Sequence, residues 1–252
     1  MSQQRRLDQI MEMIQRSGFV TTEQLVEQFR VTPQTIRRDL NELASQNKLT
    51  RHHGGAGIDS STVNTAYQER KIMNLEAKER IAKALVKQIP DGASMFINIG
   101  TTTETIARAL LDKRNLRVVT NNLHVASILS AREDFHIIIA GGEVRNRDGG
   151  IVGEAAVDFI NQFKMDFGII GISGIHSDGS LLDFDYREVR VAQSIIANSG
   201  QVLLAADHSK FGRNAMVRLG SITQADQVFT DARPPREITR ALKDNGVALH
   251  IV

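Results

Sequence analysis

The apolar positions of the first 57 residues recur at the spacing of amphipathic helices. A first helix is predicted by an i, i+3, i+4, i+7 stripe that comprises Leu7, Ile10, Met11 and Ile14. Thr21 and Gln24 stand at capping-box spacing, which predicts that a second helix starts at Thr21 or Thr22. The buried face of this second helix comprises Leu25, Val26 and Phe29. Two short helices, joined by an extended pair at 19–20, therefore open the chain.

A third helix is predicted from Pro33 to about Gln46, because Thr32 can cap it and proline suits the first helical position. Its buried stripe comprises Ile36, Leu40 and Leu43. The opposite face carries Gln34, Arg38, Asn41 and Ser45, flanked by Thr35 and Arg37. Arg can pair with guanine, and Gln or Asn with adenine, so this face is typical of a helix that reads the major groove. A solvated helix of a bundle would show the same polar face.

The residues that follow favour the DNA-binding interpretation. Residues 48–53 form a short basic run that ends at Gly54-Gly55, which predicts a β-turn beside the third helix, as in the wing of a winged helix-turn-helix. Its candidate DNA contacts are Arg51, His52 and His53, with Arg51 on a phosphate. The two histidines alone do not make a metal site, because no further ligand is near and the sequence has no cysteine. We expect no metal ion and no cofactor.

Residues 58–74 show no clear period and predict a linker between a DNA-binding domain, 1–57, and a second domain, 75–252. Tyr67, Arg70 and Lys71 make part of this segment basic and aromatic, so contact with DNA phosphates is an alternative to an ordinary linker. The net charge of +2 is too small to indicate nucleic-acid binding, which rests on where the charges lie. No apolar run approaches the roughly 18 residues of a membrane span, and we expect a cytoplasmic protein without membrane contact.

The second domain alternates continuous apolar strands with amphipathic helices. Strands are predicted at 95–99, 116–120, 135–140, 167–172 and 202–206. This alternation predicts an α/β fold with a mostly parallel sheet that helices cover on both faces. Ligands of such sheets bind outside the carboxyl ends of the strands.

Glycine and polar residues follow several of these strands. The loop at Gly100 opens a helix, so its backbone N–H groups, its threonine hydroxyls and the helix dipole suit an anion, and Lys210 adds a cation. The amides and carboxylates suit hydroxyl groups. The candidate effector-binding residues are Gly100, Thr101, Thr102, Thr103, Asn121, Asn122, Gly141, Gly142, Asp178, Asp185 and Lys210. Together they predict a crevice for a small phosphorylated metabolite, and the absence of a Gly-x-Gly-x-x-Gly motif disfavours a dinucleotide fold.

Two groups of motifs resemble one family. Residues 33–43 and 49–56 resemble the DNA-binding signature of DeoR-family repressors, and 99–103, 120–122, 140–142 and 207–211 resemble the sensor domain of that family. The resemblance implies a sensor fold similar to those of ribose-5-phosphate isomerase, the glucosamine phosphate deaminases and the CoA transferases. It also implies a homodimer or homotetramer that binds double-stranded operator DNA and leaves it when an inducer binds. The resemblance of residues 51–56, 185–190 and 209–217 to members of this family implies sn-glycerol-3-phosphate as the inducer, and control of the catabolic genes for it. The spacing of the residues by itself does not distinguish that ligand from a phosphorylated sugar.

Two alternatives come from other classes of protein. An isomerase or deaminase of sugar phosphates could take an acid and a base from Asp178, Asp183, Asp185, Glu188 and Lys210. A binding site uses the same residue types to hold hydroxyl groups, so the intact DNA-reading segment favours a regulator that is not an enzyme. A purely architectural DNA-binding protein leaves the polar strand ends unexplained, and its DNA binding would ignore every metabolite.

Overall fold

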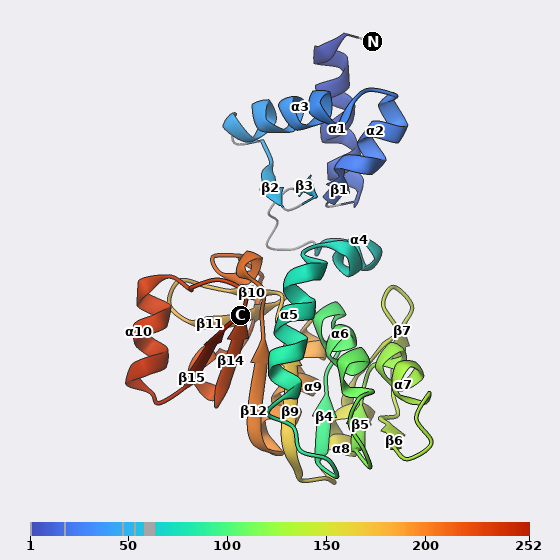
Figure 1. Ribbon diagram of the computed structural model, residues 1–252, viewed down its shortest axis with the longest axis vertical. Coiled ribbons are helices and arrows are strands. Elements are labelled where there is room, and N and C mark those ends of the chain that lie inside the picture. Colours follow the sequence, from blue (N-terminus) through green and yellow to red (C-terminus); the bar gives the residue numbers. More distant parts are fainter. Residues whose placement is uncertain (1, 18, 47, 53, 58–63) are drawn as a thin grey trace. The chain divides into compact units, whose positions relative to one another are not determined.

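The computed structural model describes residues 2–17, 19–46, 48–52, 54–57 and 64–252 (Figure 1). Its contacts divide the chain into two compact units, Met1–Leu75 and Glu76–Val252. Residues 64–74 of the predicted linker fall in the first unit, where Tyr67–Ile72 form helix α4, and residues 58–63 lie outside the described part. No helix in the described residues is long and apolar enough to cross a membrane.

The first unit is a winged helix-turn-helix. Its elements are α1 (Gln3–Ser17), β1 (Phe19–Thr21), α2 (Thr22–Phe29), α3 (Pro33–Ser45), β2 (Thr50–His52), β3 (Gly55–Gly57) and α4. The predicted capping box is confirmed, since Thr21 Oγ1 accepts from the Gln24 N–H at 3.0 Å and Gln24 Oε1 accepts from the Thr21 N–H at 2.8 Å. Strand β3 pairs antiparallel with both β1 and β2, and this small sheet forms the wing. The predicted apolar stripes pack into one core.

A buried ion pair ties α1 to α3. Arg6 Nε donates to Asp39 Oδ2 at 2.5 Å, Arg6 Nη2 donates to Asp39 Oδ1 at 3.2 Å, and both side chains are buried. The hydrogen bond to Asp39 raises the pKa of the Arg6 guanidinium. Gln3 adds hydrogen bonds from its amide nitrogen to Asp39 at 3.3 Å and to Glu42 at 2.8 Å. The amino-terminal turns of α1 therefore fix the position of α3.

The second unit is built on a seven-stranded sheet in the order β15-β14-β12-β9-β4-β5-β6, with every neighbouring pair parallel. The strands are β4 (Ser94–Ile97), β5 (Arg117–Thr120), β6 (His136–Ile139), β9 (Met165–Gly171), β12 (Ser199–Ala205), β14 (Gln227–Thr230) and β15 (Ala248–Ile251). The helices are α5 (Leu75–Val86), α6 (Thr101–Leu110), α7 (Leu123–Leu129), α8 (Glu154–Ile160), α9 (Tyr186–Ala197) and α10 (Arg236–Asp244), with short 3₁₀ turns at His208–Lys210 and Ile222–Gln224.

Helices cover both faces of this sheet, as the alternation predicted (Figure 1). Helices α5, α6 and α7 enclose one hydrophobic cluster, and α8, α9 and α10 enclose the other. The neighbouring residues Ile169 and Ile170 of β9 fall in opposite clusters, because successive side chains of a strand point to opposite faces. Both faces are thus apolar, which is why the strands read as continuous hydrophobic runs.

Two smaller antiparallel sheets were not predicted. A hairpin joins β7 (Glu143–Arg145) to β8 (Gly150–Val152), and a three-stranded sheet has the order β10 (Gly174–Ile175), β11 (Ser180–Asp183), β13 (Val217–Ser221). The sequence analysis also missed the strands β14 and β15.

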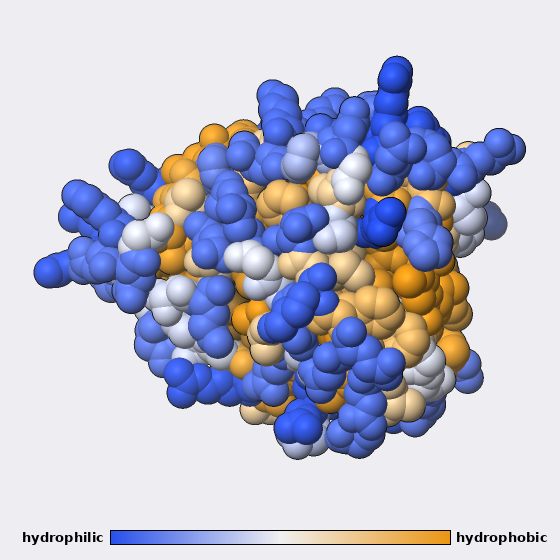
Figure 2. Space-filling model, turned by 90° about the horizontal axis from the view of Figure 1, so that it is seen from below, coloured by the Kyte–Doolittle hydropathy of each residue, from blue (hydrophilic) through white to orange (hydrophobic). Residues whose placement is uncertain are grey.

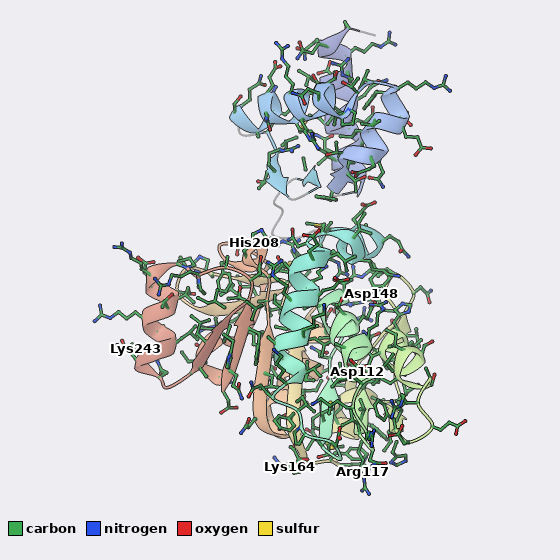
Figure 3. The ribbon with its side chains drawn as sticks, viewed as in Figure 1. Asp112, Arg117, Asp148, Lys164, His208 and Lys243 are labelled. Atoms are coloured by element: carbon green, nitrogen blue, oxygen red, sulfur yellow. The ribbon has the colours of Figure 1, made fainter. Side chains whose placement is uncertain are left out.

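The two ends of the central sheet differ in their residues. His208 and Asp148 lie toward one end of the second unit, and Arg117 and Lys164 lie at the other, where the strands begin (Figure 3). Figure 2 views the molecule from this amino end, where hydrophilic side chains surround scattered hydrophobic ones. The polar residues singled out in the sequence follow the carboxyl ends of the strands, at the opposite end.

We expect Arg6→Met to destabilise the first unit by about 1–3 kcal/mol, because the substitution leaves the buried carboxylate of Asp39 without its cation. Denaturant unfolding of the full chain, followed by amide exchange in α3, measures this. The control is Arg5→Met, which changes an exposed neighbour on the same helix and should stay within about 0.5 kcal/mol. Adding Asp39→Asn to Arg6→Met should recover most of the loss, and equal effects of the Arg5 and Arg6 variants would contradict the assignment.

Candidate nucleic-acid interface and effector site

Helix α3 presents the side chains that were predicted to read DNA. Thr32 caps its first turn by accepting from the Thr35 N–H at 3.3 Å, and Pro33 occupies the first helical position. The hydroxyls of Thr32 and Thr35 lie 2.9 Å apart, so Thr35 is partly engaged in the cap. The exposed members of the predicted set are Gln34, Arg37, Arg38 and Asn41.

These side chains border a groove with a volume of about 730 Å³. It is lined by Gln3, Arg6, Thr32, Gln34, Thr35, Arg37, Arg38, Asp39 and Asn41. Asp39 is the carboxylate in this set, and the ion pair with Arg6 neutralises its charge. The groove therefore offers arginine and amide donors to a polyanion without an uncompensated negative charge of its own.

The wing brings a further arginine toward α3. Arg51 of β2 is half-buried, and its Nη1 atom is buried without a hydrogen-bond partner. Burial lowers the pKa of the Arg51 guanidinium, and the positive charge of Arg37 lowers it further. A phosphate oxygen near both arginines would accept a hydrogen bond from Arg51 Nη1 and reduce the repulsion between the two positive charges. The backbone of His52 belongs to β2, whereas His53 lies outside the described residues.

At the carboxyl end of β4, a tight loop leads into α6. Gly100 precedes the helix with φ of 148°, a left-handed value that favours glycine. The Thr103 hydroxyl is fully buried and donates to the carbonyl oxygens of Asn98, at 2.8 Å, and Gly100, at 2.7 Å. Thr103 thus holds the loop, and the first-turn N–H groups at Thr101 and Thr102 are the ones placed for an anion.

The structure adds a residue that the sequence analysis missed. Lys78 of α5 is only 2% exposed, and its Nζ donates to Thr101 Oγ1 at 3.1 Å. Burial raises the pKa of the Asp207 carboxyl, but the charge of Lys210, the hydrogen bonds from Ser209 and the charge of Lys78 outweigh burial and lower it. Two lysines and the α6 amino terminus therefore converge on one end of the sheet. The signal in the sequence was a lysine within the apolar stripe of α5, which includes Ile81, Ala82 and Leu85.

Asn121 and Asn122 follow β5 and are fully buried. Asn122 Oδ1 caps α7 by accepting from the His124 N–H at 2.9 Å, and Asn121 Nδ2 donates to the Ile151 carbonyl at 3.1 Å. Three buried amide atoms in this region have no hydrogen-bond partner, namely Asn98 Oδ1, Asn121 Oδ1 and Asn122 Nδ2. Each buried polar atom without a hydrogen bond lowers the free energy of unfolding by about 1–3 kcal/mol. A ligand that forms hydrogen bonds with these three atoms would therefore stabilise the protein.

Asp185 has a structural role in addition to the one predicted. It caps α9 by accepting from the Arg187 N–H at 3.0 Å, and it accepts from Arg145 Nη1 at 3.0 Å. Arg145 also bonds to Asp148, through Nε and Nη2 at 2.8 Å each, and to Glu188 at 2.7 Å. Burial raises the pKa of Asp185, but the hydrogen bonds from Arg187 and Arg145 outweigh it and lower it. This buried cluster latches the β7–β8 hairpin to α9.

Three other predicted residues lie in turns. Gly142 has φ of 149°, and a side chain there would meet the Val152 carbonyl at 2.9 Å, so it allows the β7–β8 hairpin to close. Gly141 is its exposed neighbour, and no atom within 4 Å would oppose a side chain. Asp178 lies in the β10–β11 turn, where a hydrogen bond from the Ser180 N–H lowers its pKa to about 2. The structure therefore gathers Gly100–Thr102, Asn121, Asn122 and Lys210 at the strand ends, and gives Gly142 and Asp178 turn-forming roles.

No group of three or more His, Asp or Glu side chains among the described residues could hold a metal ion.

Comparison with known proteins extends over the whole chain. The chain is 59% identical to the glycerol-3-phosphate regulon repressor of Escherichia coli (strain K12) over 251 residues, which cover 100% of both proteins. It is 51% identical to the glycerol-3-phosphate regulon repressor of Haemophilus influenzae, over 99% of this chain and 97% of that one. It is also 40% identical to the HTH-type transcriptional repressor CsqR of Escherichia coli (strain K12), over 97% and 94% of the two.

Among solved structures, translation initiation factor eIF-2B of Pyrococcus horikoshii OT3 is similar with a TM-score of 0.52 and 16% identity, over 94% of this chain and 86% of that one. This likeness shows the fold alone. A ribose 5-phosphate isomerase of Methanocaldococcus jannaschii aligns over 55% of each chain with 13% identity and a TM-score of 0.41.

Two family descriptions match successive parts of the chain. The DeoR-like helix-turn-helix domain matches residues 6–62, and the DeoR C terminal sensor domain matches residues 73–232. With relatives that align over the full length and are named as repressors, these matches show that the chain belongs to the DeoR family.

Proposed function

We propose that this protein is a transcriptional repressor that leaves its operator when it binds a phosphorylated polyol, sn-glycerol-3-phosphate. The observation that carries the proposal is the presence, in one chain, of an exposed Gln-Arg-Asn face on α3 and of a strand-end site with two lysines. The names of relatives that are 59% and 51% identical support this inducer and the control of genes for its catabolism.

In the proposed complex, Gln34, Arg38 and Asn41 contact base edges in the major groove, because their side chains are exposed on one face of α3. The remaining predicted DNA contacts are Thr35, Arg37, Arg51, His52 and His53, with Arg37 and Arg51 on phosphate. We also propose a cytoplasmic location, which DNA binding by a repressor of bacterial type would require. We propose 1–57 as the DNA-binding domain and 75–252 as the sensor domain. Within the segment 58–74 between them, α4 belongs to the first unit, where Gln24 donates to Glu69 at 3.1 Å.

The effector phosphate would lie at the amino terminus of α6, on the N–H groups of Gly100–Thr102. Lys78 and Lys210 would add charge-assisted hydrogen bonds. The two carboxamides that follow β5, Asn121 and Asn122, would contact the polyol. Gly141, Gly142 and Asp185 would act through the hairpin and its latch, and Thr103 would hold the loop.

We further propose a homodimer or homotetramer that reads operator half-sites one helical turn, or a multiple of it, apart. Effector can displace the protein from DNA only if it binds the arrangement that cannot bind DNA more tightly than the one that can. An isomerase or deaminase activity would show as turnover of sugar phosphates by the purified protein, and the proposal expects none.

Arg38→Ala should weaken operator binding by roughly 1–3 kcal/mol, about 5- to 150-fold, since a bidentate contact with guanine is lost. Titration of a labelled DNA fragment from upstream of glycerol-3-phosphate catabolic genes measures this. The matched control is Arg240→Ala, an exposed arginine of α10 in the second unit, which should not change the affinity. Unchanged affinity of the Arg38 variant would refute the assignment of this residue to base recognition.

Lys210→Ala and Thr102→Val should raise the effector concentration that gives half release of DNA by about tenfold or more, because the first removes a cation and the second a hydroxyl donor beside the phosphate. Operator affinity without effector should remain that of the wild type. Lys243→Ala is the control, since Lys243 lies on α10, away from His208 and Asp148 in Figure 3. Titrations with sn-glycerol-3-phosphate and fructose-1-phosphate test the ligand, and a normal response of both variants would place the effector elsewhere.

A further inference from the structure

Two side-chain amide oxygens without a hydrogen-bond partner, those of Asn98 and Asn121, follow the neighbouring strands β4 and β5. In the register of the central sheet, Ile97 of β4 pairs with Thr120 of β5, so Asn98 and Asn121 follow at the same level on neighbouring strands. Parallel strands lie about 4.7–4.9 Å apart, and residues at one level point to the same face. Asn98 is 2% exposed and Asn121 is fully buried. Asn98 Oδ1 and Asn121 Oδ1 therefore form a neighbouring pair of buried hydrogen-bond acceptors.

In the orientation of these two amides, the atoms without a partner are oxygens, which favours a hydrogen-bond donor over an anion. The amide of Asn121 is oriented by its nitrogen, which donates to the Ile151 carbonyl, so its oxygen is the atom left for a ligand. A phosphate ester carries acceptor oxygens and would be repelled by two carbonyl oxygens. A hydroxyl group can donate to either of them, and two hydroxyl groups on adjacent carbons can satisfy both.

The side chain of Asn122 points to the opposite face of the sheet, and its atom without a hydrogen-bond partner is a donor. Successive side chains of an extended segment point to opposite faces, and Asn122 caps α7 on the face that also carries α5 and α6. Its atom without a partner is the donor Nδ2. A donor there suits the phosphate side of the site, so the polarity of the three amides matches a molecule with hydroxyl groups at one end and a phosphate at the other.

The β7–β8 hairpin covers the acceptor pair. The Ile151 N–H donates to the Asn121 carbonyl at 2.7 Å, and the Leu123 N–H donates to the Gly149 carbonyl at 3.0 Å. A side chain on Gly150 would meet Ile99 Cδ1 at 2.6 Å, so the hairpin packs closely against the loop after β4. The latch of Arg145 to Asp148, Asp185 and Glu188 holds the hairpin in this place.

We propose that Asn98 and Asn121 accept hydrogen bonds from the hydroxyl groups of the effector beneath the β7–β8 hairpin, and that this subsite distinguishes a polyol phosphate from an alkyl phosphate. The inference rests on the proposed function and adds Asn98, the hydroxyl pair and the covering hairpin to it.

The test compares two ligands that differ only in hydroxyl groups. Isothermal titration calorimetry of the full chain gives the dissociation constants of sn-glycerol-3-phosphate and of n-propyl phosphate, which lacks both hydroxyls. Asn98→Leu should raise the dissociation constant of sn-glycerol-3-phosphate about tenfold or more, and that of n-propyl phosphate less than about twofold. It should also raise the melting temperature of the effector-free protein, because an apolar group of similar size replaces a polar atom without a partner.

Asn98→Ala serves as a second variant if leucine does not fit, with the same expected ratio between the two ligands. The matched control is Asn198→Leu, a buried asparagine whose amide is satisfied by Asn161 Oδ1 and the Ser194 carbonyl, both at 2.9 Å. This control should lower the melting temperature and leave both dissociation constants unchanged.

Two outcomes would overturn the subsite while the proposed function stands. Unchanged affinity of both Asn98 variants for sn-glycerol-3-phosphate would mean that the pair binds only water, and equal losses for the two ligands would mean a structural role. A wild-type protein that binds no sn-glycerol-3-phosphate would overturn the proposed function itself, and the subsite with it.

Discussion

Parallel pairing of the strands of the central sheet is the constraint on which the candidate effector site depends. Because the strands run in one direction, every carboxyl end lies at the same edge, and residues such as Asn98, Asn121 and Asp207 are brought to one place from distant parts of the sequence. The sheet is covered on both faces, so the buried residues of its strands are mostly apolar, and the buried polar ones, such as Thr120 and Thr230, stand at the carboxyl ends. The residues that pack the core therefore lie within the strands, and the candidate binding residues lie at their carboxyl ends.

In the first unit, an ion pair neutralises the buried acidic residue of α3. A helix that approaches the DNA backbone should carry positive charge, yet α3 contains Asp39 in the middle of its sequence. Arg6 neutralises this carboxylate in the fold, and the same pair fixes α1 against α3. Arg37 and Arg38 remain exposed, and the positive charge of Arg37 lowers the pKa of Arg51, as expected of a surface that would accept a polyanion.

The sequence was most informative where structure is local. The capping box at Thr21 and Gln24 depends on residues three apart, and the apolar runs of the parallel strands depend only on burial on both faces. It failed for the β11–β13 pair, because SLLD and VRLGS mix polar and apolar residues and form no continuous apolar run of the kind that marks β4, β5 and β6. Asp185 illustrates the same limit in the site. Its position after a strand was visible, but Arg145, 40 residues away, donates to one of its oxygens and the Arg187 N–H donates to the other.

To release the protein from DNA, the contacts of an effector at the strand ends must supply a minimum difference in binding free energy between two arrangements of the protein. Moving a two-state equilibrium from 1:99 to 99:1 requires about a 10⁴-fold preference for one state, or about 5.5 kcal/mol. Hydrogen bonds to charged groups contribute about 1.5–3 kcal/mol each, so two lysines on a phosphate supply about 3–6 kcal/mol, and they reach the required amount only if both contacts form in one arrangement and are lost in the other. Lys78 is placed to link the phosphate site to the first unit, because it lies on α5 three residues beyond Leu75, where the first unit ends.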